Sequence, residues 1–166
     1  KAAVLAAAEY EGPVYLRFGG AACPVINDRP DYHFEMGKGT VVREGTDLTI
    51  VATGICVGNS LEAAKMLAAD GINAEVINIC TIKPLDEELI IKSAKKTGKI
   101  VTAEEHSVIG GLGSAVCDAV CKSYPVPVMK IGLQDVFGES GSAEALVEKY
   151  KLDGKGIYEQ IKGFLK

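Results

Sequence analysis

Two carboxylates and an imidazole stand side by side near the middle of the sequence. Glu104, Glu105 and His106 end an apolar run, where a histidine beside a carboxylate could act as a general base. The carboxyl ends of parallel strands are where such sites gather. Adjacent residues of a strand point to opposite faces, however, so at most one carboxylate can share a pocket with His106. A pairing at a subunit interface is the alternative, and we prefer it.

A glycine-rich loop follows directly and suggests a second chemistry. Gly110, Gly111 and Gly113 lie between an expected strand and an expected helix, so backbone amides there could hold a phosphate. The dinucleotide fingerprint Gly-x-Gly-x-x-Gly fails, because Val116 stands where its third glycine belongs. Asp135, a candidate for binding a ribose, lies in a loop beyond the next strand and fits poorly. A tight strand-to-helix turn explains the glycines better.

Arg17 and the cysteines are the other candidates for chemistry. Arg17 lies in an early apolar run and could bind a phosphate or form a charged contact at an interface. The cysteines form no Cys-x-x-Cys pair, and neither of the two histidines lies at ligand spacing from them, which argues against a zinc site. We expect reduced thiols in a cytoplasmic protein. The five cysteines are Cys23, Cys56, Cys80, Cys117 and Cys121.

The composition is that of a globular protein. The 166 residues are 48% hydrophobic and 24% charged, with a formal net charge of −4 and both signs interspersed. This balance gives no basis for a nucleic acid or an anionic membrane as a partner. The apolar runs are also far too short to cross a bilayer. We expect one globular domain with an appendage.

From about residue 46 onward, short apolar runs alternate with helical periodicity. This alternation predicts a three-layer α/β/α fold with a mainly parallel sheet, to which Val41–Val42 could add an edge strand. The expected strands are 47–53, 74–79, 99–103 and 126–131. The expected helices begin near residue 57 and at Asp86, 112, 142 and 155, and the first two end at Gly71 and Gly98.

The first 38 residues do not fit this alternation. They predict a helix over Ala2–Glu9, a strand over Val14–Phe18 and a linker rich in proline, aspartate and asparagine. A lone helix and strand cannot bury their own apolar surface. We therefore divide the chain into residues 1–22, the end of a preceding domain, a linker over 23–38, and a domain over 39–166.

Several stretches together resemble the C-terminal portion of transketolase, in the form found as a separate C-terminal section. The resemblance runs along nearly the whole chain, and no single motif decides it. The later stretches make it more like the split transketolase than like related enzymes. The stretches are GPVYLRFG (12–19), LTIVATG with LEAAKML (48–67), VINICTIKPLD (76–86), IVTAEEHSVIGGLGSAV (100–116), GLQDVFGESG (132–141) and LDGKGIYEQI (152–161).

The resemblance implies an enzyme that uses thiamine diphosphate and Mg²⁺. In this family a Gly-Asp-Gly motif in one domain holds the diphosphate through the metal, and a second, pyrimidine-binding domain activates the coenzyme. This sequence has no Gly-Asp-Gly. Residues 1–22 resemble the last helix and strand of the pyrimidine-binding domain. Residues from about 39 resemble the third domain, a five-stranded mixed sheet with one antiparallel edge strand, which binds no cofactor and joins the homodimer.

From this resemblance we expect the chain to contribute no catalytic, cofactor-binding or metal-binding residue to the enzyme. The candidates become parts of a subunit interface or of the edge of a site: Arg17, Glu104, Glu105, His106, Gly110, Gly111 and Gly113. The expected partners are an N-terminal section carrying the diphosphate-binding domain, the pyrimidine-binding domain and a second copy. The assembled enzyme would move a two-carbon ketol unit between sugar phosphates, whereas this chain alone would be inert.

Three alternatives remain open. The chain could belong to a 1-deoxyxylulose-5-phosphate synthase, to a 2-oxoacid dehydrogenase beta subunit, or to a nucleotide-binding regulatory module that shares the fold. One departure from the family pattern also bears on the substrate. Family members carry an arginine near position 20 that grips the substrate phosphate, but this sequence has Gly19 and Gly20. Because nothing smaller replaces a bidentate guanidinium, ordinary phosphate recognition is in doubt.

Overall fold

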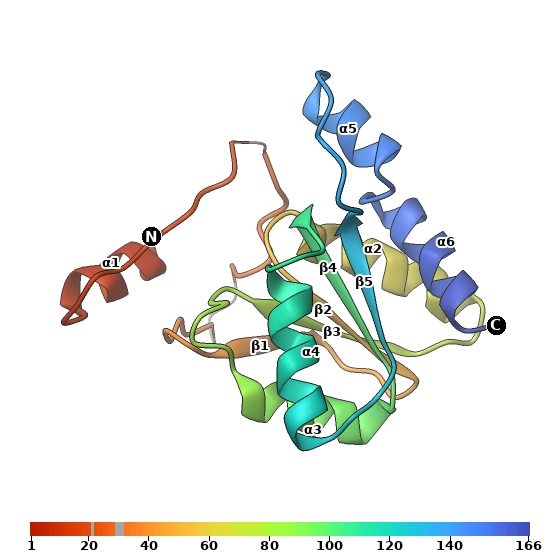
Figure 1. The fold of residues 1–166 in the computed structure, drawn as a ribbon, viewed down its shortest axis with the longest axis horizontal. Helices are drawn as coiled ribbons and strands as arrows, with labels where there is room; N and C mark the ends of the chain where they lie inside the picture. Colours follow the sequence, from red (N-terminus) through yellow and green to blue (C-terminus); the bar gives the residue numbers. More distant parts are fainter. Residues whose placement is uncertain (21, 29–31) are drawn as a thin grey trace.

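A single mixed sheet forms the centre of the molecule. The structure, a computed structural model, describes residues 1–20, 22–28 and 32–166. Within them, five strands line up in the order β1-β3-β2-β4-β5, with β1 antiparallel to β3 and the other neighbours parallel (Figure 1). The predicted sheet and its antiparallel edge strand are confirmed. The strands are β1 (Gly39–Arg43), β2 (Leu48–Ala52), β3 (Ala74–Ile79), β4 (Ile100–Ser107) and β5 (Val128–Leu133).

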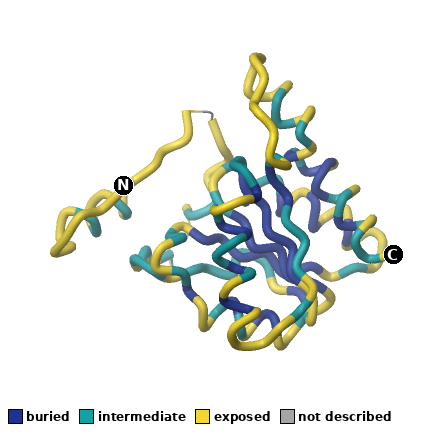
Figure 2. The backbone as a smooth tube through the Cα atoms, in the orientation of Figure 1, coloured by how far each residue is buried: buried dark blue, intermediate teal, exposed yellow. Residues whose placement is uncertain are grey.

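Helices cover both faces of this sheet. Apolar side chains of α2 and α6 pack with one face, and those of α3 and α4 pack with the other, giving two separate cores. Figure 2 shows the buried backbone concentrated in the sheet and in the helix faces that touch it. The helices are α1 (Ala2–Glu9), α2 (Cys56–Ala69), α3 (Glu87–Thr97), α4 (Leu112–Ser123), α5 (Ala143–Lys149) and α6 (Gly154–Phe164).

Local signals set the ends of α3, as the sequence predicts. The Asp86 side chain accepts a hydrogen bond from the Leu89 backbone N–H at 3.2 Å. Gly98 has φ +69°, a left-handed conformation that favours glycine. Lys95 and Lys96 lie in the last turn, where a cation complements the helix dipole.

The N-terminal segment differs from the sequence prediction. Helix α1 forms as expected and stands apart from the sheet in Figure 1. Residues 14–18 are not a β-strand, because no strand among the described residues lies beside them to complete a ladder. The prediction of a strand over residues 14–18 is therefore wrong for the isolated chain. Seven large apolar residues of the segment are exposed: Val4, Leu5, Tyr10, Val14, Tyr15, Leu16 and Phe18.

The predicted linker contains no helix and no strand where the structure describes it. Residue 21 of the predicted segment 1–22 and residues 29–31 of the predicted linker 23–38 lie outside the described residues. All five cysteines are free thiols, and only Cys56 is buried. In the described ranges, no helix has the length and apolar character that a membrane crossing needs.

Candidate functional site

The predicted site residues lie where the strand order of the sheet reverses. The connection after β2 leads to β3 on one side, whereas the connection after β4 leads to β5 on the other. In open α/β sheets, ligands bind at the carboxyl ends of the strands at such a point. Strand β4 continues to Ser107, four residues beyond its predicted end, and so carries Glu104, Glu105 and His106 within the strand itself.

Glu104 is a buried carboxylate that caps helix α4. Its side chain is 1% exposed. One oxygen accepts a hydrogen bond from the Leu112 backbone N–H at 3.0 Å, and the other accepts one from the Gly113 N–H at 2.8 Å. These are the amides that a phosphate would use at the start of a helix. Because Glu104 already occupies them, the geometry argues against a nucleotide cradle in this loop.

The glycine loop fits closely around this carboxylate. A Cβ at Gly111 would lie 2.1 Å from the nearer Glu104 oxygen, so no larger residue fits without moving the cap. Gly110 has φ +78°, and its N–H donates to the Ser114 hydroxyl at 2.9 Å. A Cβ at Gly113 would lie 2.6 Å from the Lys130 side chain. The glycines therefore build a tight turn around Glu104.

Glu105 points to the opposite face of the sheet and is engaged by the N-terminal segment. Its side chain is 18% exposed and forms an ion pair with Arg17, which is 44% exposed. The Glu105 carboxylate also lies close to Gly54, which follows β2. The strand thus sends its two carboxylates to different faces, as its period of two predicts.

His106 returns to the side of Glu104 and is partly exposed. Its Nδ1 lies 3.7 Å from the nearer Glu104 oxygen, which exceeds the length of a hydrogen bond. That oxygen already accepts the Leu112 amide. His106 and Glu104 therefore do not form the hydrogen-bonded pair that a general base and its orienting carboxylate require.

Cys56 lies at the start of α2, near both carboxylates. Burial, together with the negative charges of Glu105 and Glu104, raises the pKa of its thiol to about 12. The thiol is therefore protonated at neutral pH. A protonated, buried thiol is a core side chain and not a nucleophile.

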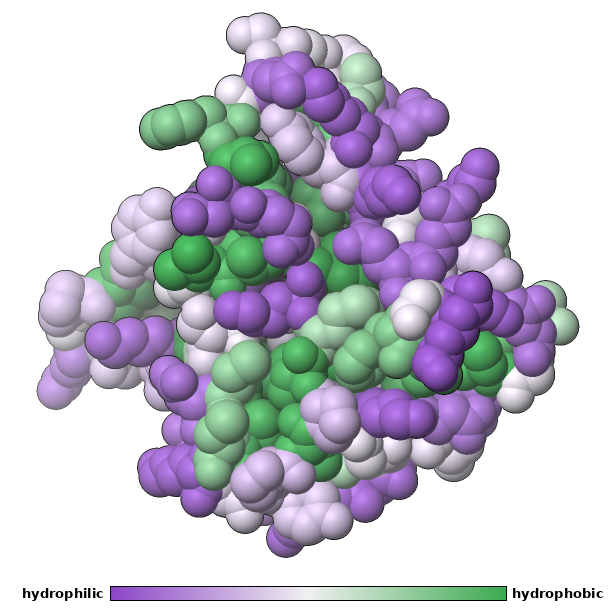
Figure 3. All heavy atoms as spheres, turned by 45° about the vertical axis from the view of Figure 1, so that its right-hand side comes forward, coloured by the Kyte–Doolittle hydropathy of each residue, from purple (hydrophilic) through white to green (hydrophobic). Residues whose placement is uncertain are grey.

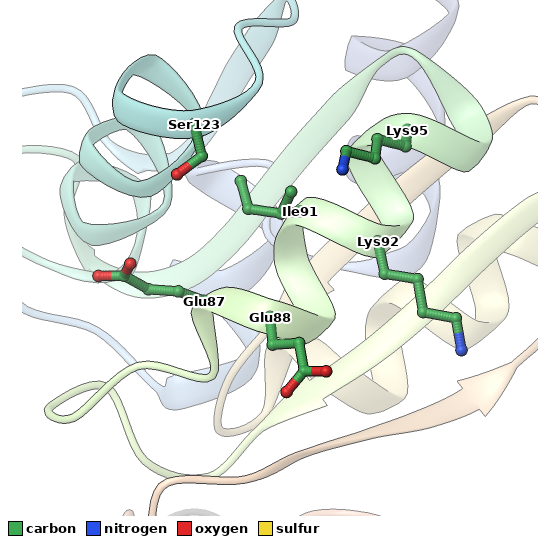
Figure 4. Close-up of a pocket in the computed structure, with 6 residues that line it drawn as sticks. All are labelled: Glu87, Glu88, Ile91, Lys92, Lys95 and Ser123. Carbon is green, nitrogen blue, oxygen red and sulfur yellow. The ribbon is translucent and has the colours of Figure 1, made fainter.

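One hollow among the described residues lies away from these carboxylates. It has a volume of about 490 Å³ and lies between α3 and α4. Figure 4 shows the side chains of Glu88 and Lys92 pointing away from Ser123. It contains no residue that the sequence singled out for chemistry. Its lining residues are Glu87, Glu88, Ile91, Lys92, Lys95 and Ser123.

Comparison with known proteins identifies the family. Residues 37–157 match the family model described as "Transketolase, C-terminal domain". The chain belongs to this family. The resemblance that the sequence suggested is therefore confirmed, and the three-layer α/β/α domain described above is a transketolase C-terminal domain.

Individual relatives of this transketolase domain also support the assignment to this family. The chain is 48% identical over 148 residues to a 6-deoxy-6-sulfo-D-fructose transketolase subunit of Clostridium sp. (strain MSTE9), covering 89% of this chain and 46% of that protein. It is 42% identical to a 1-deoxy-D-xylulose-5-phosphate synthase of Heliobacterium modesticaldum, covering 91% of this chain and 24% of that protein.

A solved structure described as a split gene transketolase, inactive beta4 tetramer, has a similar fold. It superposes with a TM-score of 0.92 at 52% identity, covering 98% of this chain and 53% of that one. The chain thus spans about half the length of the transketolase subunits that it matches.

The described residues of this transketolase domain do not fit the diphosphate end of thiamine diphosphate. They include no cluster of three histidine, cysteine, aspartate or glutamate side chains that could hold a metal ion. The sequence has no Gly-Asp-Gly. The amides at the start of α4 are already used by Glu104.

Sequence analysis did not find the cap formed by Glu104. The carboxylate precedes the helix that it caps by eight residues, whereas a capping box spans three. The hydrogen bond from the Lys130 ammonium to the Val108 carbonyl, at 2.8 Å, was missed for the same reason. The cap depends on how α4 packs against β4, and the Lys130 contact depends on the pairing of β4 with β5; the local sequence carries no signal for either.

Proposed function

We propose that this chain is the C-terminal part of a transketolase-type enzyme that transfers a two-carbon ketol unit between sugar phosphates. Its part in the enzyme is assembly: it supports the cofactor-binding domains and joins subunits. The proposal rests on the contacts that the two carboxylates make where the strand order of the sheet reverses. Glu104 caps α4 and Glu105 pairs with Arg17, so both serve internal contacts at the place where an enzyme of this fold would hold its ligand.

Residues 1–22 would belong to the preceding, pyrimidine-binding domain. Their exposed apolar side chains need a surface to pack against, since large exposed apolar patches mark contacts with other protein. Residues 14–18 would become a strand when the sheet of that domain lies beside them. The Arg17–Glu105 ion pair would then fix the preceding domain against the carboxyl end of β4.

Thiamine diphosphate and Mg²⁺ would be held by other parts of the assembled enzyme. The word "subunit" in the name of the Clostridium relative and "split gene" in the description of the solved structure support a separate N-terminal partner. Self-association is supported by the tetramer that the solved structure's description records for its own chain. The free cysteines are consistent with a cytoplasmic location.

The substrate would be a sugar whose phosphate-bearing end is not bound by an arginine at position 20. A Cβ at Gly20 would meet no atom of the described residues within 4 Å, so packing within this part of the chain does not require the glycine. We therefore propose that this position contributes to donor choice. The name of the Clostridium relative, which acts on a sulfo-sugar, supports substrates other than ordinary pentose phosphates in this family.

Reconstitution of transfer tests the proposal. The chain alone, with thiamine diphosphate and Mg²⁺, is expected to show no turnover. Joined to its pyrimidine-binding domain and mixed with an N-terminal section, it is expected to transfer the ketol unit from ketose donors to aldoses. A 1-deoxyxylulose-5-phosphate synthase is the second candidate, favoured by the 42% identity to that enzyme. Turnover with pyruvate in place of a ketose would establish it and overturn the proposal.

Charge reversal at the Arg17–Glu105 pair tests the assembly role in the same assay. R17E places two carboxylates together and is expected to lower the reconstituted activity about tenfold, because like charges in contact cost over 1 kcal/mol. E105R is expected to do the same. The double variant R17E/E105R restores an ion pair and should recover most of the activity. Equal losses in all three variants would contradict the proposed role of the pair.

A further inference from the structure

Among the described residues, no strand pairs with the outer edge of β5. The Ile100 N–H donates to the Pro127 carbonyl and the Val108 N–H donates to the Leu133 carbonyl, both at 3.0 Å, so these two carbonyls face β4. Alternation along the strand then turns the carbonyls of Lys130 and Gly132 outward, away from the sheet. An edge with unpaired backbone groups is a template for pairing with another strand.

One side chain donates hydrogen bonds to both of these outward carbonyls. The Gln134 side-chain amide donates to the Lys130 carbonyl at 3.3 Å and to the Gly132 carbonyl at 3.2 Å. The chain turns back directly after β5, where the Asp135 N–H donates to the Leu133 carbonyl and Asp135 has φ +55°. The amide of Gln134 thus takes the place that the N–H groups of a neighbouring strand would take.

The opposite edge of the sheet, at β1, is irregular. Strand β1 is short and shifts register between Val41 and Arg43, which disrupts a regular edge. Beyond its paired part, the Arg43 guanidinium donates to the Ala74 carbonyl of β3. At this end of the sheet, therefore, an arginine binds a β3 carbonyl that a longer β1 would use, and the outer edge of β1 itself is interrupted by the register shift.

We propose that Gln134 closes the β5 edge against pairing with the same edge of a second copy. A second copy is the partner because two identical edges can pair antiparallel about a two-fold axis. Val128, Met129 and Leu133 of this strand pack against the two cores but stay only half-buried, so apolar surface remains beside the edge. Figure 3 turns this side of the molecule forward and shows apolar surface in the middle and lower part of the face.

Sedimentation velocity over a range of protein concentrations tests this proposal. Gln134→Val removes both donors while keeping a residue suited to a strand end. The matched control is Gln160→Val, because the Gln160 amide also donates to two carbonyls, those of Lys151 and Gly156, but away from the sheet edge. Thermal unfolding of each variant shows whether it is folded before the comparison is made.

Gln134→Val is expected to form larger species, beyond any assembly of the wild type, with an association constant raised at least about fivefold. Gln160→Val is expected to match the wild type. A proline that replaces Val128 in the Gln134→Val background removes an outward N–H and should return the protein to wild-type sedimentation. If Gln134→Val sediments as the wild type does at every concentration, or if Gln160→Val associates equally, the proposal is wrong.

Discussion

Replacing Glu104 with alanine is expected to lower the free energy of unfolding by about 3–5 kcal/mol, since hydrogen bonds to a charged group contribute about 1.5–3 kcal/mol each. The carboxylate is 1% exposed and accepts the amides of Leu112 and Gly113. Alanine leaves both amides buried without an acceptor at the start of α4. Urea denaturation followed by circular dichroism measures the loss.

Two variants separate the cap from a general effect of charge removal. Glu104→Gln keeps one acceptor but turns its amide group toward a backbone N–H, so we expect a loss of about 1.5–3 kcal/mol. Glu105→Ala removes the neighbouring carboxylate, whose partner Arg17 is 44% exposed, and should cost under about 1 kcal/mol. Equal losses for Glu104→Ala and Glu105→Ala would contradict the cap as described.

Lys96→Ala is expected to cost about 2–3 kcal/mol at neutral pH, because it leaves a buried carboxylate without its cation. Glu75 on β3 is fully buried, and its carboxylate contacts the Lys96 ammonium and accepts a hydrogen bond from the Thr49 hydroxyl at 3.0 Å. The Lys96 ammonium also lies 3.0 Å from a Glu44 oxygen. Because Lys96 itself is 33% exposed, water can reach part of the site, which keeps the loss below that of a fully buried pair.

The pH dependence of this pair has a definite sign. Burial alone would lower the pKa of Lys96, but the hydrogen bonds to Glu75 and Glu44 and the charges of both carboxylates raise it above the usual value. A raised pKa in the folded state means that the stabilisation is complete below the unfolded value, about 10.4, and is lost as the pH rises through the folded value. The difference between wild type and Lys96→Ala should therefore be constant near neutral pH and shrink above about pH 10.5.

The adjacent lysine provides the control for this second prediction. The Lys95 ammonium lies over the Tyr124 ring at 5.9 Å from its centre and contacts no buried carboxylate among the described residues. Lys95→Ala should cost under about 1 kcal/mol at every pH. A loss for Lys96→Ala no larger than that for Lys95→Ala, or one that grows with alkaline pH, would show that the Glu75 pair does not stabilise the fold.

The helices and strands of the domain follow from local sequence. Asp86 and Gly98 bound α3, Ser142 caps α5 through the Ala145 N–H, and β3 occupies the predicted residues 74–79. These features could be predicted because a cap, a left-handed glycine or a buried apolar run depends on residues a few positions apart.

Features that depend on tertiary contacts could not be predicted in this way. Strand β4 extends beyond its predicted end because it pairs with β5 again at Ser107 and Leu133, past an irregular stretch that holds the polar residues 104–106. The strand expected at 14–18 needed a neighbour that the described residues do not supply. Local sequence identifies Glu104 as a candidate site residue. Only the fold shows which backbone amides its carboxylate binds.

We propose above all that the carboxyl end of β4 makes structural contacts between parts of the enzyme and does not bind the coenzyme. Calorimetric titration of this chain with thiamine diphosphate in the presence of Mg²⁺ tests the claim most directly. We predict no saturable binding by the chain alone, and binding once the pyrimidine-binding domain and an N-terminal section are present. One saturable site per isolated chain, weakened by Glu105→Gln, would contradict the account.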